Sequence, residues 1–356
     1  MKTKLIYVLT CAPEDTYIEQ ALMAVWSARY HNPDAHIVLL TDDKTDVLLV
    51  GKRGELLNYI SEKIVVPFDE DKNMHYRSRW LKTSVRELVK GDYLFIDCDT
   101  ITTKNLDLIE SINAEVAMVC DENLEVANHS TAAAQYMVTN CAKIGLDVLK
   151  ERYYFNSGVM YVRDTELTHR LYTLWHKHWL DGVANGLNID QPTLAMANID
   201  MGRPIRVLDN RWNVIIPSQI EEIYDSYILH FWHSVSFLFT PACMNYIREN
   251  GITPMIEYYL LHPTETFIPS DSHVSLYGMK DFRTFYQKTV RALKEYGNKI
   301  DNAFCGLEIR MRSNNLIHRL LKVGCYRSAA GIIILSKMYR VKCSKKFVYK
   351  ENYYSA

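Results

Sequence analysis

The first half of the chain alternates short apolar runs with stretches of helical periodicity. The apolar runs cover residues 5–9, 36–40, 64–68, 93–96 and 116–119. These runs are continuous rather than alternating, as in strands that are buried on both faces. Apolar runs separated by helices predict an α/β fold in which helices flank a mostly parallel sheet.

Two helices are predicted between these runs. Thr16 and Glu19 form a T-x-x-E pattern that is typical of a capping box at the start of a helix. A second helix is predicted over 76–89. The residues predicted to form the buried stripes are Ile18, Leu22 and Val25 on the first helix, and Leu81, Val85 and Leu88 on the second.

Polar residues follow three of the predicted strands at the point where each strand ends. They are Thr10, the polar turn at 41–43, and the acidic triplet at 97–99. The carboxyl ends of parallel strands meet at one edge of the sheet, and ligands bind beyond that edge. The sequence therefore predicts a ligand site there.

The triplet Asp97-Cys98-Asp99 ends the most apolar run of this half. Two carboxylates at one strand end can bind a hard divalent cation, which prefers oxygen ligands. The alternative is a strand-to-turn junction with solvated acids, the usual role of an isolated D-x-D pattern. The position at the predicted ligand-binding edge favours the cation site.

Charge is distributed unevenly along the chain. The formal net charge is −1, but residues 309–350 hold eleven Lys and Arg and no acid, so the rest carries −12. Beyond about residue 240 the pattern changes to helical segments rich in Tyr, Leu and basic residues. We predict an α/β domain over 1–240, a helical extension over 241–308 and a basic helical tail over 309–356.

The cysteines and the ends of the chain bear on the compartment. Eight cysteines are scattered without C-x-x-C spacing, and no signal peptide precedes the first predicted strand. The apolar run at 329–335 is far shorter than the roughly 20 residues of a membrane helix. The expectation is a reducing, cytoplasmic protein without a membrane span.

Several further segments, taken in order with the D-x-D strand, resemble one family. They are a loop with Tyr17, a helix with Ser78-Arg79, LFIDCDTI at 94–101, YFNSGVMYVR at 154–163, NIDQPTLA at 188–195, DNRWNV at 209–214 and YILHFW at 227–232. In this order they resemble the retaining, nucleotide-sugar-dependent glycosyltransferases of glycosyltransferase family 8. That group includes glycogenin and bacterial lipopolysaccharide galactosyltransferases. The resemblance spans about 7–232, roughly two thirds of the chain, and implies a GT-A fold.

The resemblance implies a metal site made of Asp97, Asp99 and His230. A cation held there would bridge the oxygens of the donor diphosphate and neutralise the leaving charge. Carboxylates and imidazole together suit Mn²⁺ better than Ca²⁺, and Mg²⁺ is the other ion expected. The alternative for His230 is a buried, hydrogen-bonded histidine in an aromatic strand.

The resemblance also implies a donor-binding set. Tyr17 is the stacking candidate for the base, and Asn156 and Ser157 are expected at the donor sugar. The family's Lys after the late-strand His is missing here, so its role falls to His233 or to the basic helix, or else the closing loop differs. The predicted donor-binding residues are Tyr17, Thr10, Arg79, Lys82, Asp97, Cys98, Asn156, Ser157 and His233.

Arg79, Lys82 and Arg86 form one cationic stripe on the second predicted helix. A stripe of this kind is usually a solvated helix face. The resemblance implies that Arg79 touches the donor, with Lys82 as a weaker candidate, and Arg86 is predicted to lie at the surface.

Asp190 and Gln191 are the predicted catalytic residues. The resemblance places both at the sugar pocket, with Gln191 near the reacting carbon. A Gln is a poor nucleophile, so a covalent intermediate is not required, and front-face departure and attack is an open alternative. Asp190 has a simpler alternative as an N-cap, because Pro192 is typical of a first helical turn.

The basic tail fits an anionic membrane surface better than a nucleic acid. Apolar residues at 316–323 lie among basic ones, as in helices that lie on membranes, and no nucleic-acid-binding motif is found. The alternatives are a solubilising tail or an oligomer contact.

Together these features predict a cytoplasmic, peripheral, metal-dependent glycosyltransferase. The expected reaction moves a hexose from a UDP-sugar to a glycan or glycolipid hydroxyl in surface polysaccharide synthesis. A sugar nucleotidyltransferase is an alternative, but TCAPEDTY after the first strand lacks the expected glycines. A non-catalytic sugar-nucleotide-binding protein is the other.

Overall fold

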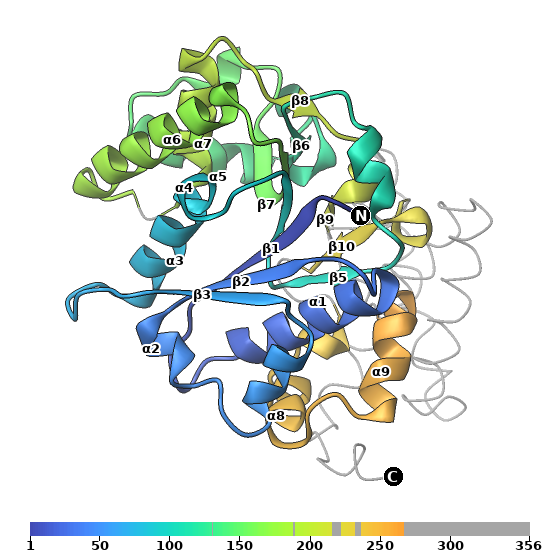
Figure 1. Cartoon of the computed structure of the whole chain (residues 1–356). Coiled ribbons are helices and arrows are strands. Elements are labelled where there is room, and N and C mark those ends of the chain that lie inside the picture. Colours follow the sequence, from blue (N-terminus) through green and yellow to red (C-terminus); the bar gives the residue numbers. More distant parts are fainter. Residues whose placement is uncertain (130, 188, 216–221, 232–235, 267–356) are drawn as a thin grey trace, which may run out of the picture.

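The centre of the molecule is a seven-stranded sheet with the strand order β3-β2-β1-β4-β7-β6-β8 (Figure 1). The computed structural model describes residues 1–129, 131–187, 189–215, 222–231 and 236–266. Neighbouring strands are parallel except for β7, which runs antiparallel to β4 and β6. The strands are β1 (Lys4–Leu9), β2 (Ile37–Asp42), β3 (Glu62–Val66), β4 (Tyr93–Ile96), β6 (Val116–Cys120), β7 (Phe155–Val162) and β8 (Arg206–Val207).

A second, three-stranded sheet has the order β5-β10-β9. It consists of β5 (Thr100–Thr102), β9 (Val214–Ile215) and β10 (Ile228–His230). β5 begins directly after the acidic triplet and pairs antiparallel with β10, so that Thr100 lies opposite His230. This pairing brings the end of β4 close to a residue far along the chain.

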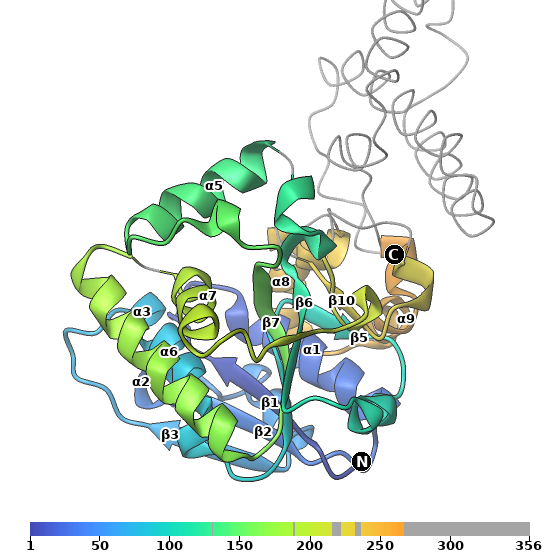
Figure 2. The same ribbon diagram turned by 90° about the horizontal axis from the view of Figure 1, so that it is seen from above.

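Helices cover both faces of the large sheet, and α6 and α7 lie side by side (Figure 2). Leu5 and Leu94 face a core that contains residues of α1, α8 and α9, whereas Ile6 and Phe95 face a core shared with α3, α4, α6 and α7. Neighbouring strand residues point to opposite faces, so both faces are apolar. The helices are α1 (Tyr17–His31), α2 (Asp43–Asp46), α3 (Met74–Thr83), α4 (Val85–Leu88), α5 (Thr131–Ala142), α6 (Glu166–Ala184), α7 (Gln191–Asp200), α8 (Pro241–Asn250) and α9 (Pro254–Leu261).

The predicted α/β architecture with a mostly parallel sheet is confirmed. The predicted strand over 93–96 coincides with β4, while β3 begins and ends two residues before the predicted 64–68. The predicted polar turn at 41–43 is partly wrong, because β2 continues through Asp42. Asp42 is fully buried, caps α2 by accepting the Thr45 N–H, and pairs with Arg77 at 2.7 Å.

The predicted capping box at the start of α1 is wrong. Thr16 occupies the N-cap position but accepts no side-chain hydrogen bond. Glu19, the other half of the pattern, instead pairs with Arg53 and Arg248. The predicted buried stripe of Ile18, Leu22 and Val25 is confirmed.

The helix predicted over 76–89 consists of two helices, α3 and α4, which meet at Ser84. Leu81 and Val85 are buried as predicted, and Leu88 is half-buried. The surface position predicted for Arg86 is wrong. Its side chain is buried, donates to the Val89 and Gly91 carbonyls, and lies 3.2 Å from an Asp164 carboxylate oxygen. Arg86 therefore secures the turn between α4 and β4.

The described part of the predicted extension packs on the main domain. Cys243, Met244 and Ile247 of α8 join the same core as α1. The tail over 309–356 lies outside the described residues, so its predicted helical character stays a prediction, as does the division into three parts. Among the described residues, no helix is long and apolar enough to cross a membrane.

Candidate active site

The candidate site lies where the order of the parallel strands reverses. The chain runs from β1 outward to β2 and β3 and then returns to the other side of β1, where β4 pairs. Ligands in such sheets bind beyond the carboxyl ends of the strands at this switch point. Thr10 and Cys11 follow β1 there, and Asp97 follows β4. The Cys98 thiol links the two segments by donating to the Val8 carbonyl at 3.3 Å.

Asp97, Asp99 and His230 come together at this point. Ligand atoms of the three side chains all lie within 4.8 Å of one another. The Phe231 N–H donates to the Asp99 carbonyl at 2.9 Å, which ties the end of β10 to the triplet. His230 is buried, whereas about a third of each Asp97 and Asp99 side chain stays accessible. The cluster is thus open on its acidic side.

The three side chains fit a divalent cation. Ligands about 2.1 Å from one octahedral ion lie roughly 3 Å apart, and His230 Nε2 lies 3.1 Å from Asp99 Oδ1. Mn²⁺ and Mg²⁺ are usually held by oxygen ligands, and a set in which one imidazole replaces an oxygen still suits them. The geometry agrees with the predicted metal site, whose ion and ligand roles remain a proposal.

Protons and neighbouring cations balance the charge of the cluster. Burial lowers the pKa of His230, but the neighbouring Asp99 carboxylate outweighs burial, so the pKa is raised. Burial likewise opposes ionisation of Asp99, but His230 holds its pKa below the ordinary value. The pKa of Asp97 is raised by burial, which Lys82 offsets only in part. A bound cation would replace the proton on His230 Nε2.

A chain of hydrogen bonds sets the orientation of His230. The Gly158 N–H donates to Asn156 Oδ1 at 2.9 Å, which identifies that atom as the amide oxygen. The same oxygen accepts from Asn213 Nδ2 at 2.9 Å, so Asn213 presents its own oxygen to His230 Nδ1 at 3.0 Å. His230 Nδ1 therefore donates, and Nε2 is the ring atom that faces Asp99. Sequence reasoning gave Asn213 no role, although it lies in the DNRWNV segment.

Gly158 is required by this arrangement. The FNSG segment is the buried beginning of β7. A Cβ at Gly158 would lie 2.4 Å from His230 Cε1 and 2.8 Å from Asn156 Oδ1. Any side chain there would displace the histidine ring.

Asn156 and Ser157 are buried in β7. The Asn156 amide donates to Asp121 at 2.9 Å and supports Asn213, and the Ser157 hydroxyl donates to Asp190 at 2.8 Å. In this structure both side chains thus hold other site residues. Their contact with a donor sugar stays a prediction.

Asp190 occupies the N-cap position of α7, as the alternative predicted, but its side chain makes no capping hydrogen bond. Its carboxylate instead lies 3.6 Å from Lys82 Nζ and 3.7 Å from Arg79 Nε. Burial raises the pKa of Asp190, but Lys82, Arg79 and the Ser157 hydroxyl outweigh it and hold the pKa below its ordinary value. Asp190 is therefore a fixed negative charge, and Gln191 begins α7 beside it.

Lys82 links the two acidic parts of the site. Its ammonium lies 3.1 Å from Asp97 Oδ1, and it is buried over the Phe95 ring. The Arg79 side chain is about one third exposed. Both cations lie close to acidic side chains of the site, so Arg79 and Lys82 do not belong to a purely solvated helix face.

Thr10 and Tyr17 lie at the two ends of the segment between β1 and α1, so Tyr17 begins the helix instead of lying in the predicted loop. Thr10 is buried and donates to the Met74 carbonyl of α3 at 3.2 Å. Tyr17 is 39% exposed at the start of α1, so its ring is accessible. His233, the predicted substitute for the missing Lys, lies outside the described residues.

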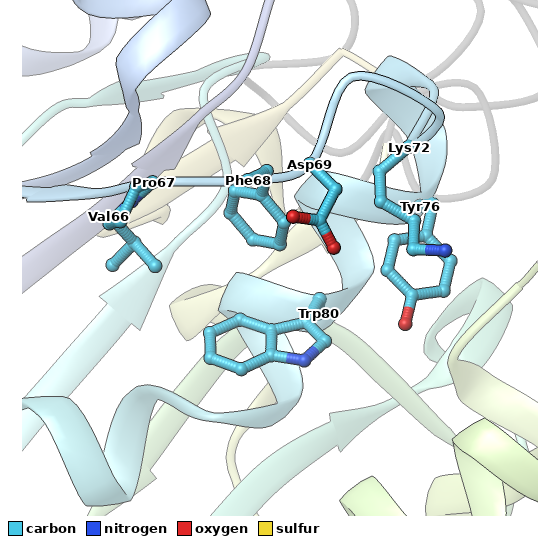
Figure 3. Close-up of a pocket in the computed structure, with 7 residues that line it drawn as sticks. All are labelled: Val66, Pro67, Phe68, Asp69, Lys72, Tyr76 and Trp80. Carbon is cyan, nitrogen blue, oxygen red and sulfur yellow. The ribbon is translucent and has the colours of Figure 1, made fainter.

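A separate cavity of about 210 Å³ lies beside α3 (Figure 3). Trp80 packs edge-on against Phe68 there, with ring centres 5.2 Å apart. None of the predicted site residues lines this cavity. The residues that do are Val66, Pro67, Phe68, Asp69, Lys72, Tyr76 and Trp80.

Solved structures with similar folds include glycosyltransferases. A galactosyltransferase, LgtC, solved with donor and acceptor sugar analogs, is 12% identical, with 76% of this chain and 98% of that chain covered and a TM-score of 0.46. Mouse xyloside xylosyltransferase 1 is 16% identical, with 65% and 97% covered and a TM-score of 0.41. An active-site mutant of LgtC is 13% identical, with 69% and 94% covered and a TM-score of 0.45. A search of curated proteins finds no match.

The family assignment rests on the sequence. The sequence model described as glycosyl transferase family 8 matches residues 10–235, nearly two thirds of the chain. The match contains the acidic triplet, the FNSG segment, Asp190-Gln191 and His230. The chain therefore belongs to glycosyl transferase family 8 and is a glycosyltransferase.

Proposed function

We propose that this glycosyltransferase is metal-dependent and moves a hexose, glucose or galactose, from a UDP-sugar to a hydroxyl of a glycan or glycolipid. Transfer proceeds with retention, and the product belongs to a surface polysaccharide of the lipopolysaccharide or capsule type. The observation that carries the proposal is the meeting of Asp97, Asp99 and His230 at the switch point of the sheet. That site suits a diphosphate held through a cation.

The charged residues divide into two groups with different roles. When bound, a divalent cation held by Asp97, Asp99 and His230 supplies Lewis-acid neutralisation of the departing diphosphate. Asp190 holds its negative charge beside the sugar, where it would stabilise positive charge that develops at the reacting carbon. Arg79 and Lys82 hold Asp190 in place, and Gln191, the next residue in the chain, orients the sugar.

The experiment that tests this function is a screen of UDP- and GDP-sugars for metal-dependent hydrolysis and transfer. We expect release of UDP from UDP-glucose or UDP-galactose with Mn²⁺, and NMR should show the donor's anomeric configuration in the product. Formation of a nucleotide-sugar from a nucleoside triphosphate and a sugar phosphate would instead identify a nucleotidyltransferase. Binding without turnover would identify a non-catalytic protein.

Asn213 offers a test of the metal site that does not depend on activity. Asn213→Ala removes the acceptor of His230 Nδ1, and loss of such a partner typically weakens metal binding about 10- to 100-fold. The measurement is the Mn²⁺ dissociation constant from electron paramagnetic resonance of the free ion. Asn185→Ala, at the exposed end of α6, is the matched control. Equal Mn²⁺ affinity in both variants would contradict the role of Asn213.

We further propose that the basic tail holds the protein at the inner face of the plasma membrane, where a lipid-linked acceptor would be available. Residues 309–350 of the tail carry eleven Lys and Arg without an acid, and each basic residue near an anionic surface contributes about 1 kcal/mol. Truncation after residue 308 should leave donor hydrolysis intact and weaken binding to anionic liposomes. Wild-type binding should also fall with added salt. Equal liposome binding by the truncated protein would refute the membrane role.

A further inference from the structure

A buried carboxylate on α1 lies between two arginines from distant parts of the chain. Glu19 is 1% exposed. Its Oε1 accepts from Arg53 Nε at 2.7 Å and from Arg248 Nε at 3.1 Å. A buried charge requires such partners, so Glu19 joins the segment after β2 and the helix α8 to α1.

The same two arginines also hold the loop between β1 and α1. Arg53 donates to the Asp15 carbonyl at 2.8 Å and to the Pro13 carbonyl at 3.1 Å, and Arg248 donates to the same Asp15 carbonyl. The Asp15 carboxylate in turn accepts the N–H groups of Ala12 at 2.6 Å and Tyr17 at 3.1 Å. The loop is therefore fixed by contacts outside itself as well as within.

The end of helix α8 packs closely against the turn that contains Arg53. Its C-cap Gly251 has a φ of 73°, and a Cβ there would lie 2.1 Å from Glu55 Oε2 of the 3₁₀ turn that contains Arg53 (Arg53–Asn58). Met244 and Ile247 bury the inner face of α8 in the core with α1. Arg248 lies beyond residue 235, where the match to the family model ends.

We propose that Arg248 is a positioning residue for donor binding: it holds the loop at 10–17 in the conformation that receives the nucleotide. This inference rests on the proposed function, because that loop lies at the carboxyl end of β1 beside the switch point. A loop that is ordered before binding loses less conformational entropy when the ligand binds. Helix α8 would in this way influence the affinity for the donor without contacting the donor.

The test compares Arg248→Ala and Arg248→Lys with wild type. We expect Arg248→Ala to raise the dissociation constant of UDP, measured by calorimetry with Mn²⁺, and the KM for the donor by about tenfold, with kcat and the Mn²⁺ affinity changed less than about twofold. Arg248→Lys, which keeps the charge but lacks the fork of donors, should lie between. Arg152→Ala, which removes an exposed arginine paired with Glu125, is the control and should match wild type.

Hydrogen exchange of the amides at 12–17 separates this inference from the proposed function. Faster exchange in Arg248→Ala than in wild type is expected whether or not UDP binds. Unchanged exchange, or unchanged UDP affinity in a wild type that binds UDP, would overturn the inference and leave the proposed function standing. If wild type binds no UDP, the proposed function fails, and so does a donor role for Arg248, while faster exchange would still uphold the anchoring contact. If Arg248→Ala does not fold, the same comparisons are made with Arg248→Lys.

Discussion

Asp97→Asn and Asp99→Asn should each reduce transfer by about 10³-fold or more. Lewis-acid stabilisation is worth several kcal/mol, and each 1.4 kcal/mol corresponds to a factor of ten in rate. Neither change should shift the free energy of unfolding by more than about 1 kcal/mol, because an Asn oxygen can still accept from Lys82 or His230. The measurements are initial rates with saturating donor and thermal melting curves.

EDTA and a surface variant control this result. EDTA should stop the wild-type reaction, and added Mn²⁺ should restore it. Asp71→Asn removes a carboxylate whose side chain is 69% exposed and pairs with its neighbour Lys72, so its rate should equal that of wild type. Full wild-type activity in EDTA would remove the metal from the proposed mechanism.

His230→Ala should weaken Mn²⁺ binding strongly, and high metal concentration should recover much of the lost activity. His230→Cys and His230→Asp should retain more activity than the Ala variant, because each can still supply a ligand. The measurements are the Mn²⁺ concentration that gives half-maximal rate and the limiting rate at saturating Mn²⁺. His233→Ala, the nearest other histidine, should leave the Mn²⁺ affinity unchanged.

The melting temperature alone does not distinguish the two roles of His230. The ring is buried and packs against Gly158, so its removal opens a cavity and lowers stability whether or not it binds metal. The decisive result is rescue by metal. If Mn²⁺ recovers nothing in any of the three variants, His230 is a packed core residue and the ligand assignment is wrong. If His233→Ala shows the rescue instead, the ligand role moves to His233.

Local sequence patterns predicted the elements that depend on local chemistry. The run over 93–96 is apolar throughout because β4 is buried on both faces, and it ends in acids because the sheet edge there is solvated. Residue type and position at a strand end were sufficient to predict the roles of Asp97 and Asp99. The predicted roles of His230 and Asp190 depended on the resemblance to the family.

The errors arose where a residue's partner is distant in the sequence. Glu19 matches a capping box locally, but Arg53 and Arg248 attract its carboxylate more strongly than one backbone N–H does. Helical spacing places Arg86 in a cationic stripe. In the structure the helix breaks at Ser84, and the Arg86 side chain is buried beside Asp164. Periodicity predicts which face of a helix a residue occupies, but not which residues pack against that face.

The pattern of residue types predicted the α/β class, the edge of the sheet that carries the candidate site, and the kinds of side chain gathered there. How those side chains act on one another follows from the folded structure. Asn213 orients His230, Gly158 leaves room for its ring, and Lys82 lies between Asp97 and Asp190. Each of these relations depends on distances of a few ångströms between residues far apart in the chain. Such distances are set by strand pairing and helix packing, which the pattern of residue types does not specify.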